Sequence, residues 1–277
     1  MPARAGQTVQ GDAIEMQTAR RHPFHWLAIA ALAALSCPAA AADFTVGIGA
    51  GVAPDYEGSD EYRLVPTWLI AADDLYHPDT YVTLAGPVLR SNFVPHQHLR
   101  AGLSGQYIPE RNDVEDDEVD EMSSVDAAVL LGGIFGWDFF SSPEIEFAAL
   151  VDLRYDVAGD SGYLITPRLS YVNRVSKRVS ISTELFSNYA SEDYMDEYFG
   201  VGAADAAISG LDTFDADAGF KDIGLSASVN YRFAQKWSVS LLGGYARLLG
   251  DAADSPVVDD RGNANQLFLG FTLNYRI

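Results

Sequence analysis

Apolar and polar residues alternate one by one over long stretches of this 277-residue chain. The C-terminal stretch NQLFLGFTLNYRI places Leu267, Leu269, Phe271 and Leu273 on one face, and mostly polar or small residues lie between them. A period of two predicts an extended strand with one apolar and one polar face. Phe268 is the exception to this alternation.

The same alternation recurs along the whole chain and predicts ten long strands. They cover residues 43–53, 62–72, 97–108, 125–139, 144–156, 162–173, 178–189, 220–233, 236–248 and 266–277. Residues 79–94 fit either one bent strand or two short strands around Gly86-Pro87. With an even strand count, this segment supplies two strands for a total of twelve, and the alternative total is ten.

Strand length separates two fold classes that share this alternation. Strands of soluble sandwiches usually have about five or six residues, whereas strands that cross a membrane need about 9–11. Lipid offers no hydrogen bonds to the backbone, so a sheet within a bilayer must close on itself. The sequence therefore predicts an all-β fold, a closed antiparallel transmembrane β-barrel whose final strand pairs with the first.

The N-terminal segment has the three parts of a secretory signal. Arg20 and Arg21 precede an apolar run over residues 26–35, and small residues follow at 39–42. We expect a signal peptide over residues 1–42, cleaved after Ala42, and a barrel over 43–277. Translation starts either at Met16 or further upstream with a long charged region. The only cysteine, Cys37, leaves with this signal unless it is a lipidated cysteine.

The charge balance limits the partners of the exported chain. The full sequence has 18 basic and 39 acidic residues, and removal of residues 1–42 leaves 15 and 37, a net charge of −22. Such a balance excludes nucleic acid as a partner and argues against peripheral docking of the whole protein on anionic lipid.

The connections between the predicted strands alternate in length. Short turns lie at residues 140–143, 176–177 and 234–235, whereas residues 109–124, 190–218 and 250–264 form long loops. Outer-membrane barrels have short periplasmic turns and long external loops. We therefore expect the long loops outside the cell and both chain ends in the periplasm.

Four motifs resemble one family. They are APDYEGSDEYRLVP at residues 53–66, YFGVGAADAAISGL at 198–211, DADAGFKDIGLS at 215–226 and RLLGDAADSPVV at 247–258. In this order they are similar to the MipA/OmpV family, the MltA-interacting proteins of the Gram-negative outer membrane. The resemblance implies an integral barrel of the cell outer membrane, in contact with its lipid and lipopolysaccharide.

The same resemblance implies a role in peptidoglycan biogenesis. The namesake member is regarded as a non-enzymatic scaffold that brings a lytic transglycosylase, a murein hydrolase, together with a penicillin-binding protein, a murein synthase. A second hypothesis is a narrow cation-preferring pore or a surface receptor. The third is a lipid- or peptide-cleaving enzyme, but the histidines after residue 42, His77, His96 and His98, have no motif of a triad beside them.

Two external loops hold candidate functional residues. The acidic loop at 109–124 crowds carboxylates that could bind a divalent cation, and the candidate ligands are Asp116, Asp117, Glu118 and Asp120. A solvated block of like charges without a metal is the alternative. The second loop, 190–218, carries apolar residues and a helix-prone run at 203–208. Its side chains either plug the barrel or face a partner, and the candidates are Tyr194, Tyr198, Phe199 and Val201.

Charged residues on the polar faces of the central strands are expected to line the lumen. The candidates are Glu144, Glu146, Asp152, Arg154, Asp156, Arg168, Glu184 and Arg232. They either select ions in a pore or pair with one another and close a narrow barrel. No pattern in the sequence indicates a cofactor.

Overall fold

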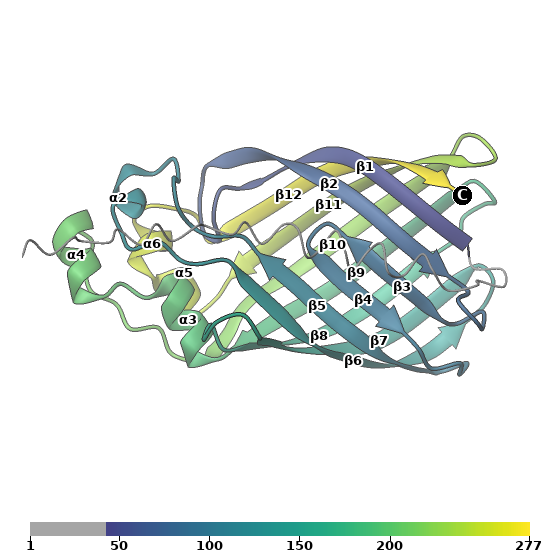
Figure 1. The fold of residues 1–277 in the computed structure, drawn as a ribbon, viewed down its shortest axis with the longest axis horizontal. Helices are drawn as coiled ribbons and strands as arrows, with labels where there is room; N and C mark the ends of the chain where they lie inside the picture. Colours follow the sequence, from purple (N-terminus) through teal and green to yellow (C-terminus); the bar gives the residue numbers. More distant parts are fainter. Residues whose placement is uncertain (1–42) are drawn as a thin grey trace, which may run out of the picture. The chain divides into compact units, whose positions relative to one another are not determined.

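The structure, a computed structural model, describes residues 43–277, which form twelve strands (Figure 1). The predicted signal peptide at residues 1–42 lies outside the described residues. The strands are β1 (Asp43–Pro54), β2 (Tyr62–Asp73), β3 (Tyr81–Ala85), β4 (Val88–Asn92), β5 (Leu99–Ile108), β6 (Ala128–Ser141), β7 (Ile145–Asp156), β8 (Tyr163–Asn173), β9 (Val179–Ala190), β10 (Gly219–Arg232), β11 (Trp237–Leu248) and β12 (Asn265–Arg276).

Each strand pairs antiparallel with the next, and β12 pairs with β1, so the sheet closes into a barrel. At this seam Thr45 lies opposite Arg276 and Val52 opposite Leu269. The short strands β3 and β4 form a hairpin whose turn residue Gly86 has a φ of +53°, a conformation that glycine adopts without strain. The prediction of twelve strands is confirmed, and the alternative of ten is wrong.

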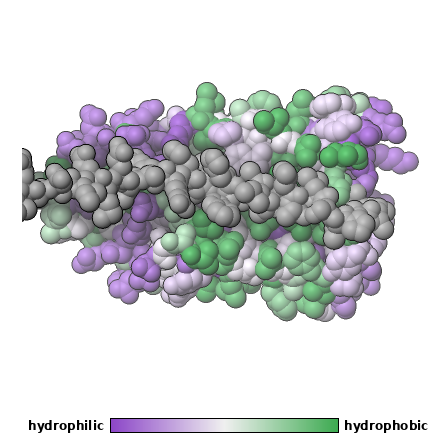
Figure 2. Space-filling view, in the orientation of Figure 1, coloured by the Kyte–Doolittle hydropathy of each residue, from purple (hydrophilic) through white to green (hydrophobic). Residues whose placement is uncertain are grey.

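The alternating residues divide between the outside and the inside of the barrel. Outward side chains are apolar and strongly exposed, for example Ile48 at 74% and Leu64 at 80% of their full area. On the face drawn in Figure 2, hydrophobic residues gather over the middle of the barrel in green, with hydrophilic residues toward both ends. Exposed apolar surface of this extent is stable only in contact with lipid.

The two ends of the barrel differ. At one end, three long connections at 109–127, 191–218 and 249–264 form what we call the cap. The cap contains five short helices, α2 (Asp117–Asp120), α3 (Glu192–Phe199), α4 (Ala203–Ser209), α5 (Asp251–Asp254) and α6 (Pro256–Asp259). The other end, the short-turn end, has the tight turns, the start of β1 and the C-terminus (Figure 1). None of the helices in residues 43–277 has the length and apolar character that a bilayer crossing requires.

Candidate functional site: the cap and the lumen

The cap has its own apolar core. Ser191 begins α3 by accepting a hydrogen bond from the backbone N–H of Tyr194, and the helix buries three of the four predicted loop residues. The fourth, Val201, follows the helix and packs in a second cluster with Val119 and Val257. Tyr194, Tyr198, Phe199 and Val201 retain 2%, 6%, 0% and 1% of their exposed area. Residues so deeply buried cannot face a partner in this conformation.

The cap core continues into the barrel wall. Tyr194, Tyr198 and Phe199 share one cluster with inward-facing leucines at the cap ends of three strands, Leu130 of β6, Leu164 of β8 and Leu248 of β11. Helix α3 therefore lies in the mouth of the barrel. The inner face is apolar at this level, although the alternation predicted a polar interior throughout.

A buried lysine connects the cap to the wall. The register of β10 shifts at a β-bulge, so that the consecutive residues Lys221 and Asp222 both lie inside and are 3% exposed. The Lys221 ammonium donates to Asp222 at 2.8 Å and also to Glu57 in the β1–β2 loop. The Tyr194 hydroxyl donates to the other oxygen of Glu57 at 3.2 Å. Glu57 is thus held from both the wall and the cap.

Three tyrosines of the cap end have perturbed acidities. Burial is the largest cause that raises the pKa of Tyr194 well above its ordinary value of 10.0, and the negative charge of Glu57 adds to it. Burial also raises the pKa of Tyr56 and of Tyr198. All three phenols therefore stay protonated, and neutral, while the cap is packed.

The loops of the cap also bind one another through polar contacts. Arg111, which is 8% exposed, donates to the carbonyl oxygen of Tyr198 at 3.0 Å, and Ser255 donates to that of Phe199 at 2.6 Å. Burial lowers the pKa of Arg111. The first and third loops therefore both bind the carbonyl groups at the end of α3.

The acidic candidates of the first loop serve local structure. Asp116 begins α2, accepting from the N–H of Val119 at 3.0 Å, and receives Arg261 at 2.8 Å. Glu118 also binds Arg261, and Asp120 accepts from the N–H of Val114 at 3.0 Å. Asp117 lies in the first turn of α2. Residues 43–277 contain no group of three histidine, cysteine or acidic side chains arranged for a metal ion.

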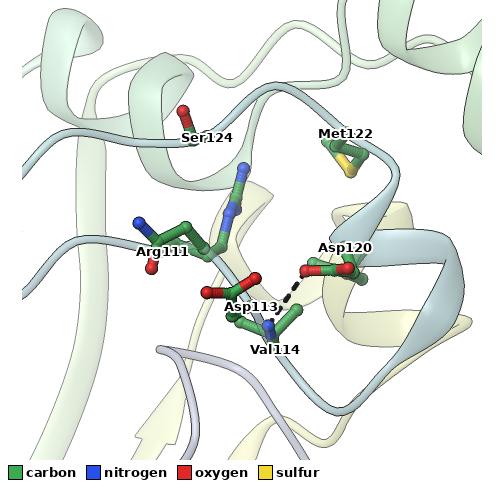
Figure 3. A pocket seen from close by; sticks show the side chains of 8 residues that line it. Arg111, Asp113, Val114, Asp120, Met122 and Ser124 are labelled. Carbon is green, nitrogen blue, oxygen red and sulfur yellow. Dashed lines mark hydrogen bonds between the residues drawn. The ribbon is translucent and has the colours of Figure 1, made fainter.

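A small surface pocket lies beside this loop (Figure 3). Its lining includes Arg111, Asp113, Val114 and Met122, and the dashed contact in the figure joins Val114 to Asp120. Of its polar lining groups, Arg111 donates to the Tyr198 carbonyl and Asp120 accepts from Val114.

An ion pair crosses the lumen. Arg90 of β4 binds Glu184 of β9 at 3.2 Å, although four strands separate β4 from β9 around the barrel. Arg168 of β8 donates to the same Glu184 at 2.6 Å and to Asp152 of β7 at 2.5 Å. These four side chains therefore form one network from wall to wall.

Two further groups lie along the same side of the interior. Arg154 donates to Thr166 at 2.7 Å and to Gln106, both uncharged. Nearer the short-turn end, Arg100 binds Asp138 at 2.8 Å and Glu146 at 3.4 Å. Glu146 also receives Arg174 at 2.8 Å.

Comparison with known proteins assigns the chain to a family. The family model of the MltA-interacting protein MipA matches residues 46–277. The chain belongs to the MipA family. It is therefore an integral β-barrel protein of the outer membrane, consistent with its apolar band and closed sheet. No curated protein sequence matches it.

Solved structures similar to this MipA-family chain are outer-membrane barrels. The NanC porin is 8% identical with a TM-score of 0.39, over 86% of this chain and 100% of that one. An outer membrane channel from Pseudomonas putida F1 is 9% identical with a TM-score of 0.43, over 87% and 97%. The outer membrane protease OmpT from Escherichia coli is 10% identical with a TM-score of 0.30, over 85% and 96%. Similarities this distant do not indicate a function for this chain.

Three of the predicted lumen residues of this MipA-family barrel take no part in the network across the lumen. Glu144 precedes β7 in an exposed turn, because the strand begins one residue later than predicted. Arg232 ends β10 and is exposed at the rim of the short-turn end. Asp156 lies at the cap end of β7, where it accepts from the backbone N–H groups of Ala158 and Ser161 at 3.0 and 3.2 Å. It orders a loop instead of lining a pore.

The sequence alone does not reveal the partners that complete the networks. Arg90 lies in the segment 79–94, which fits either one bent strand or two short ones, so its facing is not predicted. Its contact with Glu184 joins residues 94 positions apart. Lys221 lies within the motif at residues 215–226, which by itself indicates no partner for its side chain. A signal existed, because outward Phe220 and Ile223 are three residues apart, which breaks the period of two and marks the bulge.

Proposed function

We propose that this MipA-family protein is a closed, non-enzymatic barrel that acts as a scaffold for murein enzymes. The observation that carries closure is the Arg90–Glu184 ion pair, which joins opposite walls of the lumen. A barrel blocked in this way offers its ends, and not its interior, to other molecules. The family description, MltA-interacting protein, supports a murein-cleaving enzyme as a partner of one end.

We assign the cap to the cell exterior and the short-turn end to the periplasm. The length difference between the connections supports this orientation. In this arrangement the cap plugs the barrel through Tyr194, Tyr198 and Phe199, while Val201 packs within the cap. The periplasmic turns are then the part of the chain that a lytic transglycosylase and a penicillin-binding protein can reach.

One observation favours the second candidate function, a narrow pore. Within the lumen, Asp152 Oδ1, Arg154 Nε and Arg90 Nε are buried and have no hydrogen-bond partner among the described residues. Buried polar atoms of this kind are normally satisfied by water. A hydrated interior would support slow permeation if the network opened.

Oriented capture tests the scaffold. The only cysteine of the sequence, Cys37, lies in the predicted signal peptide, so a barrel expressed from residue 43 onward with one new cysteine has a single attachment point. Ala207→Cys anchors the barrel by its cap, and Gln235→Cys anchors it by the short-turn end, since both positions are exposed. From detergent extracts of cell envelopes, we expect a lytic transglycosylase and a penicillin-binding protein on the first support and a large loss on the second. Absence of both enzymes from both supports would refute the scaffold.

A further inference from the structure

Basic residues are concentrated in one sector of the short-turn end, an end that also carries Asp43, Asp73, Asp74 and Glu144. Six of the 15 basic residues after residue 42 lie there, within or beside the turns that follow β8 and β10 and at the end of β12. They are Arg174, Lys177, Arg178, Arg232, Lys236 and Arg276. Most of the acidic residues after residue 42 lie in the cap.

These basic residues form one surface because their backbones are neighbours. The N–H of Arg232 donates to the carbonyl of Arg178 at 2.8 Å, which joins the β8–β9 turn to the end of β10. The N–H of Arg276 donates to the carbonyl of Lys236 at 2.8 Å, which joins the β10–β11 turn to β12. The cations therefore occupy adjacent positions on one sector of the rim.

Four of the six cations lack a carboxylate partner. Arg174 binds Glu146, and Arg276 binds Asp43. The other four, Lys177, Arg178, Arg232 and Lys236, are exposed and make no ion pair within the described part of the chain. We call these four the basic turn patch.

The basic turn patch adjoins apolar and aromatic groups that face the membrane. Lys236 Nζ lies 5.6 Å from the centre of the Tyr275 ring, which packs on Trp237 at 4.9 Å between ring centres. Within the turns themselves, Val175 is 59% exposed and Phe233 is 49% exposed. Exposed apolar groups beside a belt of tyrosine and tryptophan are typical of the level of lipid headgroups.

We propose that the basic turn patch binds the phosphate of anionic phospholipid headgroups in the periplasmic leaflet. The inference rests on the proposed orientation and goes beyond the scaffold role. Ammonium and guanidinium groups donate to phosphate oxygens, while Val175 and Phe233 contact the acyl boundary. An acidic protein surface would match the charge but would leave these apolar side chains in water. The net charge of −22 disfavours lipid docking of the whole protein but does not describe this sector.

Lipid titration of the protein purified from outer membranes in a non-ionic detergent tests this proposal. Bound phosphatidylglycerol is counted by native mass spectrometry, with phosphatidylethanolamine as the zwitterionic comparison. Each cation near a lipid surface contributes a factor of about five in affinity. We expect Lys236→Gln to weaken phosphatidylglycerol binding about five-fold and Lys177→Gln/Lys236→Gln about 25-fold, with phosphatidylethanolamine unaffected.

The matched control is Arg247→Gln, which removes an exposed cation from the cap end of β11, the strand that begins beside Lys236. We expect this variant to bind phosphatidylglycerol as the unmodified protein does. An equal loss in Arg247→Gln, equal retention of the two lipids, or full competition by inorganic phosphate at the same phosphate concentration would overturn the proposal. The last result would make the patch a site for free anions. Failure of enzyme capture leaves this test unaffected.

Discussion

Lys221 illustrates how one residue joins two parts of the molecule. The residue is 3% exposed, and its ammonium is shared by Asp222 of the wall and Glu57 of the β1–β2 loop. Glu57 also accepts a hydrogen bond from Tyr194 of the cap. A buried charge is stable only while its partners remain, because an unpaired charge cannot recover its hydration.

Replacement of this lysine is predicted to loosen the cap. Lys221→Met leaves Asp222 without its cation, and removal of one partner of a buried ion pair typically costs about 3–5 kcal/mol. We expect the α3 loop to become sensitive to chymotrypsin in folded barrels, with cleavage near Tyr194. The exposed Lys236→Met serves as the control and should leave the loop resistant. Equal resistance of both variants would contradict this role of Lys221.

Alkaline pH is predicted to weaken the cap through its tyrosines. Burial raises the pKa of Tyr56, Tyr194 and Tyr198 above the ordinary 10.0, whereas the same phenols in an opened cap ionise near 10.0. The stabilisation is therefore complete below pH 10 and is lost as pH rises through the elevated values.

Ultraviolet titration of tyrosinate measures this effect. A late phase of tyrosine ionisation should belong to the buried three, Tyr56, Tyr194 and Tyr198. Tyr194→Phe should remove about one tyrosine from that late phase. A single phase near pH 10 in the intact protein would show that the cap does not protect these phenols.

At the scale of the element, alternation predicts strands well because burial in lipid acts on every second residue. The observed ends of β1, β2 and β9 differ from the predicted ones by one residue. Helix α4 also follows from local signals, since Gly210 ends it with a φ of +80°. Helix α3 and its contacts were not predictable, because they depend on strand ends far away in the sequence. The same holds for the Arg90–Glu184 pair.

The seam between β1 and β12 depends on a close approach of two backbones. A Cβ atom on Gly49 would collide with the backbone oxygen of Phe271, which also accepts from Thr67 at 2.6 Å. The neighbouring strand cannot move away without breaking its ladder of hydrogen bonds. Glycine is therefore needed at this position for the barrel to close tightly.

We predict that Gly49→Ala weakens the seam. Forced overpacking typically costs about 1–3 kcal/mol, so the compact form should convert to the unfolded form at a lower temperature. The measurement is a gel of heat-treated samples in which folded and unfolded barrels migrate differently. Gly219→Ala is the control, since no atom lies within 4 Å of a Cβ built there. Equal conversion temperatures for the two variants would contradict the close approach.

For the whole molecule, two barriers lie in series along the axis of the barrel. The cap fills one mouth with apolar side chains, and the Arg90–Glu184 pair crosses the lumen below it. Current through a pore requires a continuous path, so removal of one barrier leaves the other in place. The charges at this crossing are Arg90, Arg154 and Arg168 against Asp152 and Glu184, a surplus of one cation.

Planar-bilayer conductance of four proteins separates these barriers. We expect no steady current from the intact protein, from a variant with residues 191–218 replaced by Asn-Gly, or from Arg90→Ser/Glu184→Ser. The combined variant should conduct, provided that it still shows heat-dependent migration as a folded barrel. Because Arg154 and Arg168 then face only Asp152, its current should favour anions over cations. Steady cation-selective current from the intact protein would instead establish the pore and remove the closed lumen on which the scaffold depends.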